Sequence, residues 1–325
     1  MTDRILVTGG AGALGSSLTR MLLTHGFRVT VIDRLQPNCA WRLRGVSRNE
    51  NLNYVWKAVE DMTGKDIEGI DTIIYCSAQA DRPLGLSSPR YTVFNNIIPL
   101  VHILEFAKSS KSTKFLLPSS GTIFLGVPNS ELPVSEYTQP KPSNPYSASK
   151  FMEEIICQSY SRAYGFPVVV LRSGLVYGRG MRLDISIAQF IMMALENKPI
   201  HVRSPQATRT PAHIDDVLKF WSLVIEADPF KFAGKIIHTV PGIEYSMVSI
   251  AETVKRVLGS SSAIIPEEYE HGELINGSPA REWTISMAAK ELGVVCDVSL
   301  DEGIRRTAPY IREIMEHPES IVNWQ

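Results

Sequence analysis

Short apolar runs alternate with longer amphipathic segments over most of the chain. The runs are short enough to be buried parallel strands, and they lie at residues 5–8, 28–33, 53–59, 71–76 and 114–118. Between them apolar residues recur at helical spacing, most clearly over 91–108 and 146–163. This alternation predicts an α/β fold built on a doubly wound, Rossmann-type parallel sheet.

The first apolar run leads into a turn with three glycines spaced three residues apart. Gly9 permits a tight turn, Gly12 lets the backbone approach a pyrophosphate, and Gly15 lets the following helix lie close to the strand. That helix begins near Ala13 and Leu14, and its N-terminus would face the phosphates. Because such turns also occur without a ligand, the glycines alone do not establish dinucleotide binding.

Asp33 strengthens the case for a dinucleotide. It closes the second strand, about 20 residues after the glycines, where an acid takes the adenosine ribose hydroxyls. A carboxylate there would repel a 2′-phosphate, so NAD is predicted rather than NADP, and only the adjacent Arg34 argues against this choice. Further candidate cofactor contacts follow the third and fourth strands, at the edge where such sheets bind ligands: Asp61, Met62, Ser77, Ala78 and Gln79.

Candidate catalytic chemistry lies in the segment Pro145–Lys150. Tyr146 and Lys150 are four residues apart, so both side chains lie on one face of a helix. A phenol has an ordinary pKa near 10, and a neighbouring ammonium favours the phenolate, so the pair can exchange a proton with a substrate alcohol near neutral pH. The lysine can also hold the nicotinamide ribose. A Tyr-x-x-x-Lys pair is common by chance on helix surfaces, but its place after a fifth strand ending in two serines favours the catalytic interpretation.

Composition narrows the class of protein. The 325 residues are 44% hydrophobic and 21% charged, which suits one large or two intimate domains. The net charge of −1 and the lack of basic runs argue against nucleic acid or an anionic membrane as the main partner. No apolar run is long enough to span a membrane and no signal peptide is evident, so a cytoplasmic protein is expected. The spacing of the four cysteines, and of His213 with Asp215 and Asp216, predicts no metal site.

The ordered series of motifs resembles the extended short-chain dehydrogenase/reductases, in particular the NAD-dependent epimerase/dehydratase group that acts on nucleotide sugars. The resemblance covers nearly the whole chain and comprises the Thr8–Gly15 turn, Asp33, Asp61, Ser77–Gln79, Asn96, Ser119–Thr122, Tyr146 with Lys150, Arg172–Gly178, Arg209 before His213–Asp216, and Ser299–Ile304.

This likeness implies roles for several of the matching residues. It places Asn96 among the cofactor contacts, Asp61 near the adenine and Ser120 on the reacting oxygen. Arg209 would grip a diphosphate, although a surface guanidinium beside two acids is the alternative. The likeness also implies a homodimer through the helices 92–108 and 146–163.

Departures from the family pattern bear on the reaction. Dehydratases of the group carry an Asp-Glu pair after the residue matching Ser120, because elimination of water needs an extra acid and base. This chain has Gly121 and Thr122 there, so neither dehydration nor the related decarboxylation is expected.

Two further departures concern the grip on a diphosphate. Leu175 replaces the asparagine that contacts it, and the usual Arg-x-Gly-Asp is not clearly present at 275–279, although Arg281 is nearby. Arg179 and Arg182 could compensate, or could bind a carboxylate instead.

The favoured function is NAD-dependent C4 epimerisation of a nucleotide sugar, with Tyr146 as the acid/base and Ser120 and Thr122 orienting the oxygen. A dehydrogenase or reductase of a sugar-derived alcohol or hydroxy acid remains an alternative, as does a module that merely binds the dinucleotide. The predicted substrate contacts are Gln79, Ser120, Thr122, Tyr146, Leu175, Arg179 and Arg209. The NAD-binding domain is expected at 1–174, completed by about 208–242, and a substrate lobe at 175–207 and 243–325.

Overall fold

The structure, a computed structural model, describes residues 3–109, 114–240, 242–267 and 293–317. The chain divides into two compact units. Unit 1 comprises Met1–Gly126, Gln139–Ser173 and Phe220–His238, and unit 2 comprises Val127–Thr138, Gly174–Lys219 and Thr239–Gln325. Each unit is therefore assembled from segments that are far apart in the sequence.

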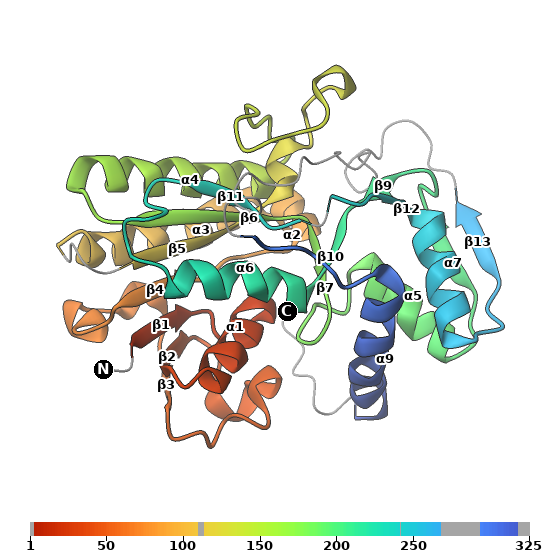
Figure 1. The fold of residues 1–325 in the computed structure, drawn as a ribbon, viewed down its shortest axis with the longest axis horizontal. Coiled ribbons are helices and arrows are strands. Elements are labelled where there is room, and N and C mark those ends of the chain that lie inside the picture. The colour runs from red at the N-terminus through yellow and green to blue at the C-terminus, as the bar shows by residue number, and fades with distance from the viewer. Residues whose placement is uncertain (1–2, 110–113, 241, 268–292, 318–325) are drawn as a thin grey trace. The chain divides into compact units, whose positions relative to one another are not determined.

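Unit 1 contains a parallel sheet that has, in the described residues, seven strands in the order β11-β6-β5-β4-β1-β2-β3 (Figure 1). The strands are β1 (Arg4–Thr8), β2 (Arg28–Asp33), β3 (Leu52–Trp56), β4 (Thr72–Tyr75), β5 (Lys114–Ser120), β6 (Val168–Ser173) and β11 (Ile236–His238). The order reverses at β1, which pairs with β2 on one side and β4 on the other. This is the doubly wound arrangement predicted from the sequence, and ligands bind such sheets where the strand order reverses.

Helices cover both faces of this sheet. The helix α1 (Ala13–Thr24) packs on β1 and β2, while α3 (Pro89–Ala107) and α4 (Pro145–Tyr164) pack against each other on the opposite face (Figure 1). With both faces covered, strand residues such as Leu6, Ile73 and Phe115 have no exposed surface. This double burial explains why the strands are continuous apolar runs rather than alternating patterns.

Local sequence sets both ends of α4. Asn144 is its N-cap, and its side-chain oxygen accepts the backbone N–H of Ser147 at 2.9 Å. The Ser147 hydroxyl in turn accepts the backbone N–H of Asn144. Pro145 occupies the first turn, where its missing N–H costs nothing. Gly165 ends the helix with a φ of 70°, a conformation that favours glycine. The helix that carries Tyr146 and Lys150 therefore starts at a fixed residue.

Unit 2 has smaller elements: β7 (Leu175–Tyr177), α5 (Ser186–Leu195), β8 (Ile200–Arg203), β9 (Thr208–Arg209), β10 (Pro211–His213), β12 (Tyr245–Ser246), α7 (Met247–Leu258), β13 (Ile264–Glu267) and α9 (Leu300–Glu316). The strands form the pairs β7/β10, β8/β13 and β9/β12. The helix α6 (Ile214–Glu226) begins in unit 2 and ends in unit 1. Asp216 in its first turn accepts the N–H groups of Asp297 and Val298, which fixes the chain just before α9.

Among the five strands expected from the sequence, two ends differ from the structure by more than one residue. The third strand ends at Trp56 because Val59–Asp61 turn into a short 3-10 helix, and the fifth continues to Ser120. None of the described helices is long and apolar enough to cross a lipid bilayer.

Candidate active site

The turn between β1 and α1 has no room for a side chain at Gly9 or Gly15. Gly9 has a φ of +65°, and a Cβ on it would lie 2.8 Å from the backbone of Cys76 and Ser77. A Cβ on Gly15 would lie 2.3 Å from the Gly9 carbonyl oxygen. The N-cap of α1 is Gly12, which offers no side-chain acceptor, so the first N–H groups of α1, including those of Ala13 and Leu14, remain available to an anion. This cradle fits the diphosphate of a dinucleotide.

Asp33 ties the end of β2 to this turn. Its Oδ2 accepts the Ala11 N–H at 2.9 Å and its Oδ1 accepts the Leu35 N–H at 3.0 Å. Burial raises the pKa of the Asp33 carboxyl, because these hydrogen bonds do not fully offset the loss of water. The carboxylate is thus oriented beside the cradle, where the sequence predicts the adenosine ribose.

Arg34 was the feature of the sequence that favoured NADP, and its guanidinium contacts Glu60 and Asn95. Its guanidinium lies 3.2 Å from a Glu60 carboxylate oxygen and donates to the Asn95 side-chain oxygen at 3.2 Å. Of the next two predicted contacts, Asp61 is exposed in the 3-10 helix after β3. Met62 is buried in the core, and its carbonyl lies 2.9 Å from His102 Nε2.

Asn96 holds the loop after β4 in place. It is fully buried in α3 and accepts the Gln79 N–H at 2.6 Å while donating to the Gln79 carbonyl at 3.1 Å. Its amide also donates to Ser149 Oγ at 2.9 Å, which joins the loop to α4. Gln79 is buried, whereas Ser77 and Ala78 are half-buried. The predicted cofactor loop therefore has a fixed course between α3 and α4.

The predicted catalytic residues come from the end of β5 and the start of α4. Ser120 is the last residue of β5, and its Oγ accepts the Thr122 hydroxyl at 3.0 Å. Tyr146 lies half-buried in the first turn of α4, and Lys150 is buried one turn later. Because α4 packs against β5 and the turn that follows it, the structure brings both sets of residues to one edge of the sheet.

The ammonium of Lys150 contacts a residue that the sequence reasoning missed. Its Nζ lies 2.5 Å from Glu153 Oε2, and the two side chains are 6% and 0% exposed. Burial alone would lower the pKa of Lys150, but the Glu153 carboxylate outweighs it and the pKa is raised. The signal was present in the sequence, because Glu153 follows Lys150 by three residues and therefore lies on the same face of the helix.

A second buried ion pair, also missed, fixes α4 to the sheet. Arg172 on β6 donates from Nε and Nη2 to the two oxygens of Glu154, at 2.9 and 2.7 Å, and both side chains are 2% exposed. Ser119 donates its hydroxyl to the same carboxylate. The two serines that end β5 thus divide their roles, since Ser119 holds α4 and Ser120 stays with Thr122.

The remaining predicted substrate contacts lie in unit 2. Leu175 begins β7 and pairs with Pro211 of β10. The guanidinium of Arg179 lies 5.6 Å from the Tyr310 ring centroid, and Arg209 donates to the Thr208 carbonyl at 2.7 Å. The segment 275–279 and Arg281 lie outside the described residues. Within the described part of the chain, no group of three or more His, Cys, Asp or Glu side chains could hold a metal.

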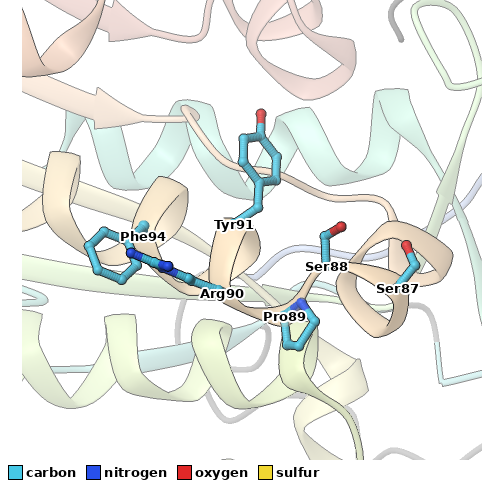
Figure 2. Close-up of a pocket in the computed structure, with 6 residues that line it drawn as sticks. All are labelled: Ser87, Ser88, Pro89, Arg90, Tyr91 and Phe94. Atoms are coloured by element: carbon cyan, nitrogen blue, oxygen red, sulfur yellow. The ribbon is translucent and has the colours of Figure 1, made fainter.

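An open hollow in unit 1 lies at the junction of α2 (Arg82–Ser87) and α3 (Figure 2). Its lining residues are Ser87, Ser88, Pro89, Arg90, Tyr91 and Phe94. The Arg90 guanidinium lies 5.6 Å from the Phe94 ring centroid. None of the catalytic or cofactor residues predicted from the sequence lines this hollow.

Known proteins resemble this chain over nearly its full length. UDP-glucuronate 4-epimerase of Thermodesulfobacterium geofontis is 28% identical and aligns over 97% of this chain and 98% of its own. Among solved structures, UDP-glucose 4-epimerase of Thermotoga maritima with UDP-glucose has a TM-score of 0.85 at 25% identity. UDP-glucuronic acid 4-epimerase of Bacillus cereus, in complex with UDP-glucuronic acid and NAD, has the same TM-score and identity. Each alignment to these two structures covers 96% of this chain and 99% of the other.

The sequence model of one family matches residues 5–237, which include the glycine turn, Asp33, Tyr146 and Lys150. The chain therefore belongs to the NAD-dependent epimerase/dehydratase family.

Proposed function

We propose that this protein is an NAD-dependent epimerase that inverts C4 of a nucleotide-linked sugar of the UDP-sugar type. One observation carries the proposal: Ser120, Thr122, Tyr146 and Lys150 gather at one sheet edge, and Gly121 and Thr122 stand where elimination would need an acid and a base. The 4-epimerases among the similar proteins support the same reaction.

The mechanism needs one acid/base residue. Tyr146, as phenolate, takes the proton of the C4 hydroxyl while Ser120 and Thr122 orient that oxygen. Bound NAD would accept the C4 hydride and later return it. The keto sugar rotates in the site, so that the hydride returns to its other face. Tyr146 then gives the proton back to the C4 oxygen. Lys150 favours the phenolate through its charge and can hold the nicotinamide ribose.

We assign binding roles along the same lines. The cradle of Gly9, Gly12 and Gly15 would hold the NAD diphosphate, and Asp33 the adenosine ribose. The NAD-binding domain is placed at 1–174 and about 208–242, and the substrate lobe at 175–207 and 243–325. The substrate contacts that we assign to that lobe are Leu175, Arg179 and Arg209, and Gln79 is the one assigned to the loop after β4.

We also propose a homodimer through α3 and α4. Tyr91 and Phe94 lie on the first turns of α3 (Figure 2). Ile98 follows four residues after Phe94, and all three side chains are exposed, Phe94 to 59%. Met152 and Ile155 are exposed on the neighbouring α4. Sedimentation should give a dimer for the wild type and a monomer for Phe94→Asp. The cytoplasm is the location we expect, and cell fractionation tests it.

The alternative is a net dehydrogenase or reductase of a sugar-derived alcohol or hydroxy acid. It would use the same Ser120, Tyr146 and Lys150, and the leucine at position 175 favours it because that residue cannot hydrogen-bond a diphosphate. The two reactions differ in whether the ketone stays bound.

One experiment separates them. Purified protein is incubated with NAD and candidate UDP-sugars while reduced cofactor is followed by absorbance and product stereochemistry by NMR. An inverted C4 with no accumulation of NADH supports epimerisation, whereas stoichiometric NADH with a released ketone overturns it. Tyr146→Phe should lower turnover by about 10² or more without changing NAD affinity.

A further inference from the structure

Glu153 is a buried carboxylate whose ion pair joins it to a residue of its own helix, Lys150. Its Oε2 contacts Lys150, and its Oε1 is buried without a hydrogen-bond partner among the described residues. Burying a charge is unfavourable unless it is paired and hydrogen-bonded, and half of this carboxylate is neither. Its neighbour Glu154 already ties α4 to the sheet through Arg172. The position of Glu153 therefore points to Lys150 rather than to helix packing.

Two cations lie near Glu153: Lys150, which contacts it, and Arg172 of β6, which pairs with Glu154. Glu154 and Cys157 face Glu153 from α4, and Tyr75 faces it from β4. The Tyr75 hydroxyl is buried and, like Glu153 Oε1, has no hydrogen-bond partner in the described part of the chain.

Lys150 has two further neighbours, Tyr146 on α4 and Cys76 after β4. Burial raises the pKa values of Tyr75, Cys76 and Cys157, so these three groups are neutral near pH 7. Because Glu154 is paired with Arg172, the charge presented to Tyr146 depends mainly on Lys150 and Glu153.

We propose that Glu153 is a positioning residue for the catalytic pair: it fixes the Lys150 ammonium and offsets part of the positive charge that this ammonium presents to Tyr146. The proposal rests on the proposed roles of Tyr146 and Lys150. An ammonium has three donors, so the bond to Glu153 fixes its direction and leaves donors for a ribose hydroxyl.

The geometry lets Glu153 change its charge without releasing Lys150. A proton can settle on Oε1 while Oε2 keeps the lysine bond. Burial raises the pKa of the Glu153 carboxyl to about 7, against the opposing effect of Lys150. Below that pH Glu153 is protonated and neutral, so Tyr146 experiences more of the positive charge of Lys150. Above that pH the Glu153 carboxylate offsets a larger part of this charge. Glu153→Gln imitates the protonated form at nearly the same size.

The test compares Glu153→Gln and Glu153→Asp with the wild type. We expect Glu153→Gln to move the acid limb of the pH–rate profile to lower pH by about one unit. Glu153→Asp keeps the carboxylate, so its acid limb should lie closer to that of the wild type than the acid limb of Glu153→Gln does. Glu105→Gln is the matched control, because it removes the carboxylate of another i,i+3 lysine pair, with Lys108, at an exposed site away from Tyr146. Its profile should match the wild type.

A second readout needs no turnover. Ultraviolet titration of the phenolate, with Tyr146→Phe as the reference, reports the ionisation of Tyr146 with and without NAD. We expect its midpoint to fall in Glu153→Gln. If the wild type epimerises no sugar but this midpoint falls, the proposed function fails and the role of Glu153 stands. If Glu153→Gln folds and both the acid limb and the midpoint stay in place, the role of Glu153 is refuted.

Poor folding of Glu153→Gln would not end the test. NMR titration of isotope-labelled glutamate carboxyls in the wild type then decides. A carboxyl that titrates near neutral pH together with the Tyr146 signal supports the proposal, whereas no glutamate titrating near neutrality overturns it.

Discussion

The buried pair of Arg172 and Glu154 leads to a prediction about stability. Glu154→Gln removes one charge but keeps the shape of the side chain, so Arg172 is left with a positive charge at 2% exposure. The glutamine keeps one acceptor oxygen, so the guanidinium loses one of its two hydrogen bonds of 2.9 and 2.7 Å and keeps the other only to a neutral amide, and Ser119 loses its charged acceptor. Breaking a buried pair from one side typically costs about 3–5 kcal/mol. That is a large part of the ~5–15 kcal/mol by which most proteins are stable.

Urea and thermal unfolding measure this loss. An unfolding entropy of about 2.1 cal/mol/K per residue gives about 0.7 kcal/mol/K for 325 residues, so Tm should fall by about 4–7 °C. The exposed control Glu105→Gln should leave Tm nearly unchanged, because solvent screens exposed ion pairs. The double variant Glu154→Leu with Arg172→Met should recover much of the loss, because it leaves no unpaired charge. A cost below about 1 kcal/mol for Glu154→Gln would refute the argument from buried charge.

Three further predictions concern single residues. Lys114 caps the end of α6, where its buried ammonium donates to three backbone carbonyls, so Lys114→Met should cost about 3 kcal/mol and speed hydrogen exchange there. Glu60→Gln frees Arg34, so calorimetry should find NADP binding tighter by up to about fivefold and NAD binding unchanged. The raised pKa of Glu153 means that the folded chain binds the extra proton between pH 4.5 and about 7. Stability should therefore fall as pH rises through this window, by up to about 3 kcal/mol, and urea titrations of Glu153→Gln should lack this component.

The parts of the fold that were predicted from sequence depend on local patterns. A strand buried on both faces must be apolar throughout, and the turn after β1 must be glycine at positions where a Cβ would meet backbone. Asp33 was found because the spacing from such a turn to an acid reflects one strand and one helix. These constraints lie within some 30 residues of chain.

What was missed depends on contacts between distant segments. The rotation of α4 on the sheet decides that Glu154 meets Arg172 of β6, and nothing local specifies that rotation. Glu153 was missed although its i,i+3 spacing to Lys150 is local. Ser119 and Ser120 are the same residue type. They reach different partners because successive side chains of a strand point to opposite faces of the sheet. The overlong third strand was predicted because Val59 continues the apolar pattern, although the backbone has already turned.

The interleaving of the two units also has a consequence for biosynthesis. The strand β11 is the last to join the large sheet, and it pairs with β6 although more than 60 residues separate them. A growing chain that has made β6 but not residue 236 therefore carries an unpaired strand edge, with backbone N–H and C=O groups open to other chains. Until synthesis passes that point the edge stays exposed, so slower synthesis of residues 174–235 would lengthen the time in which it can pair with another chain.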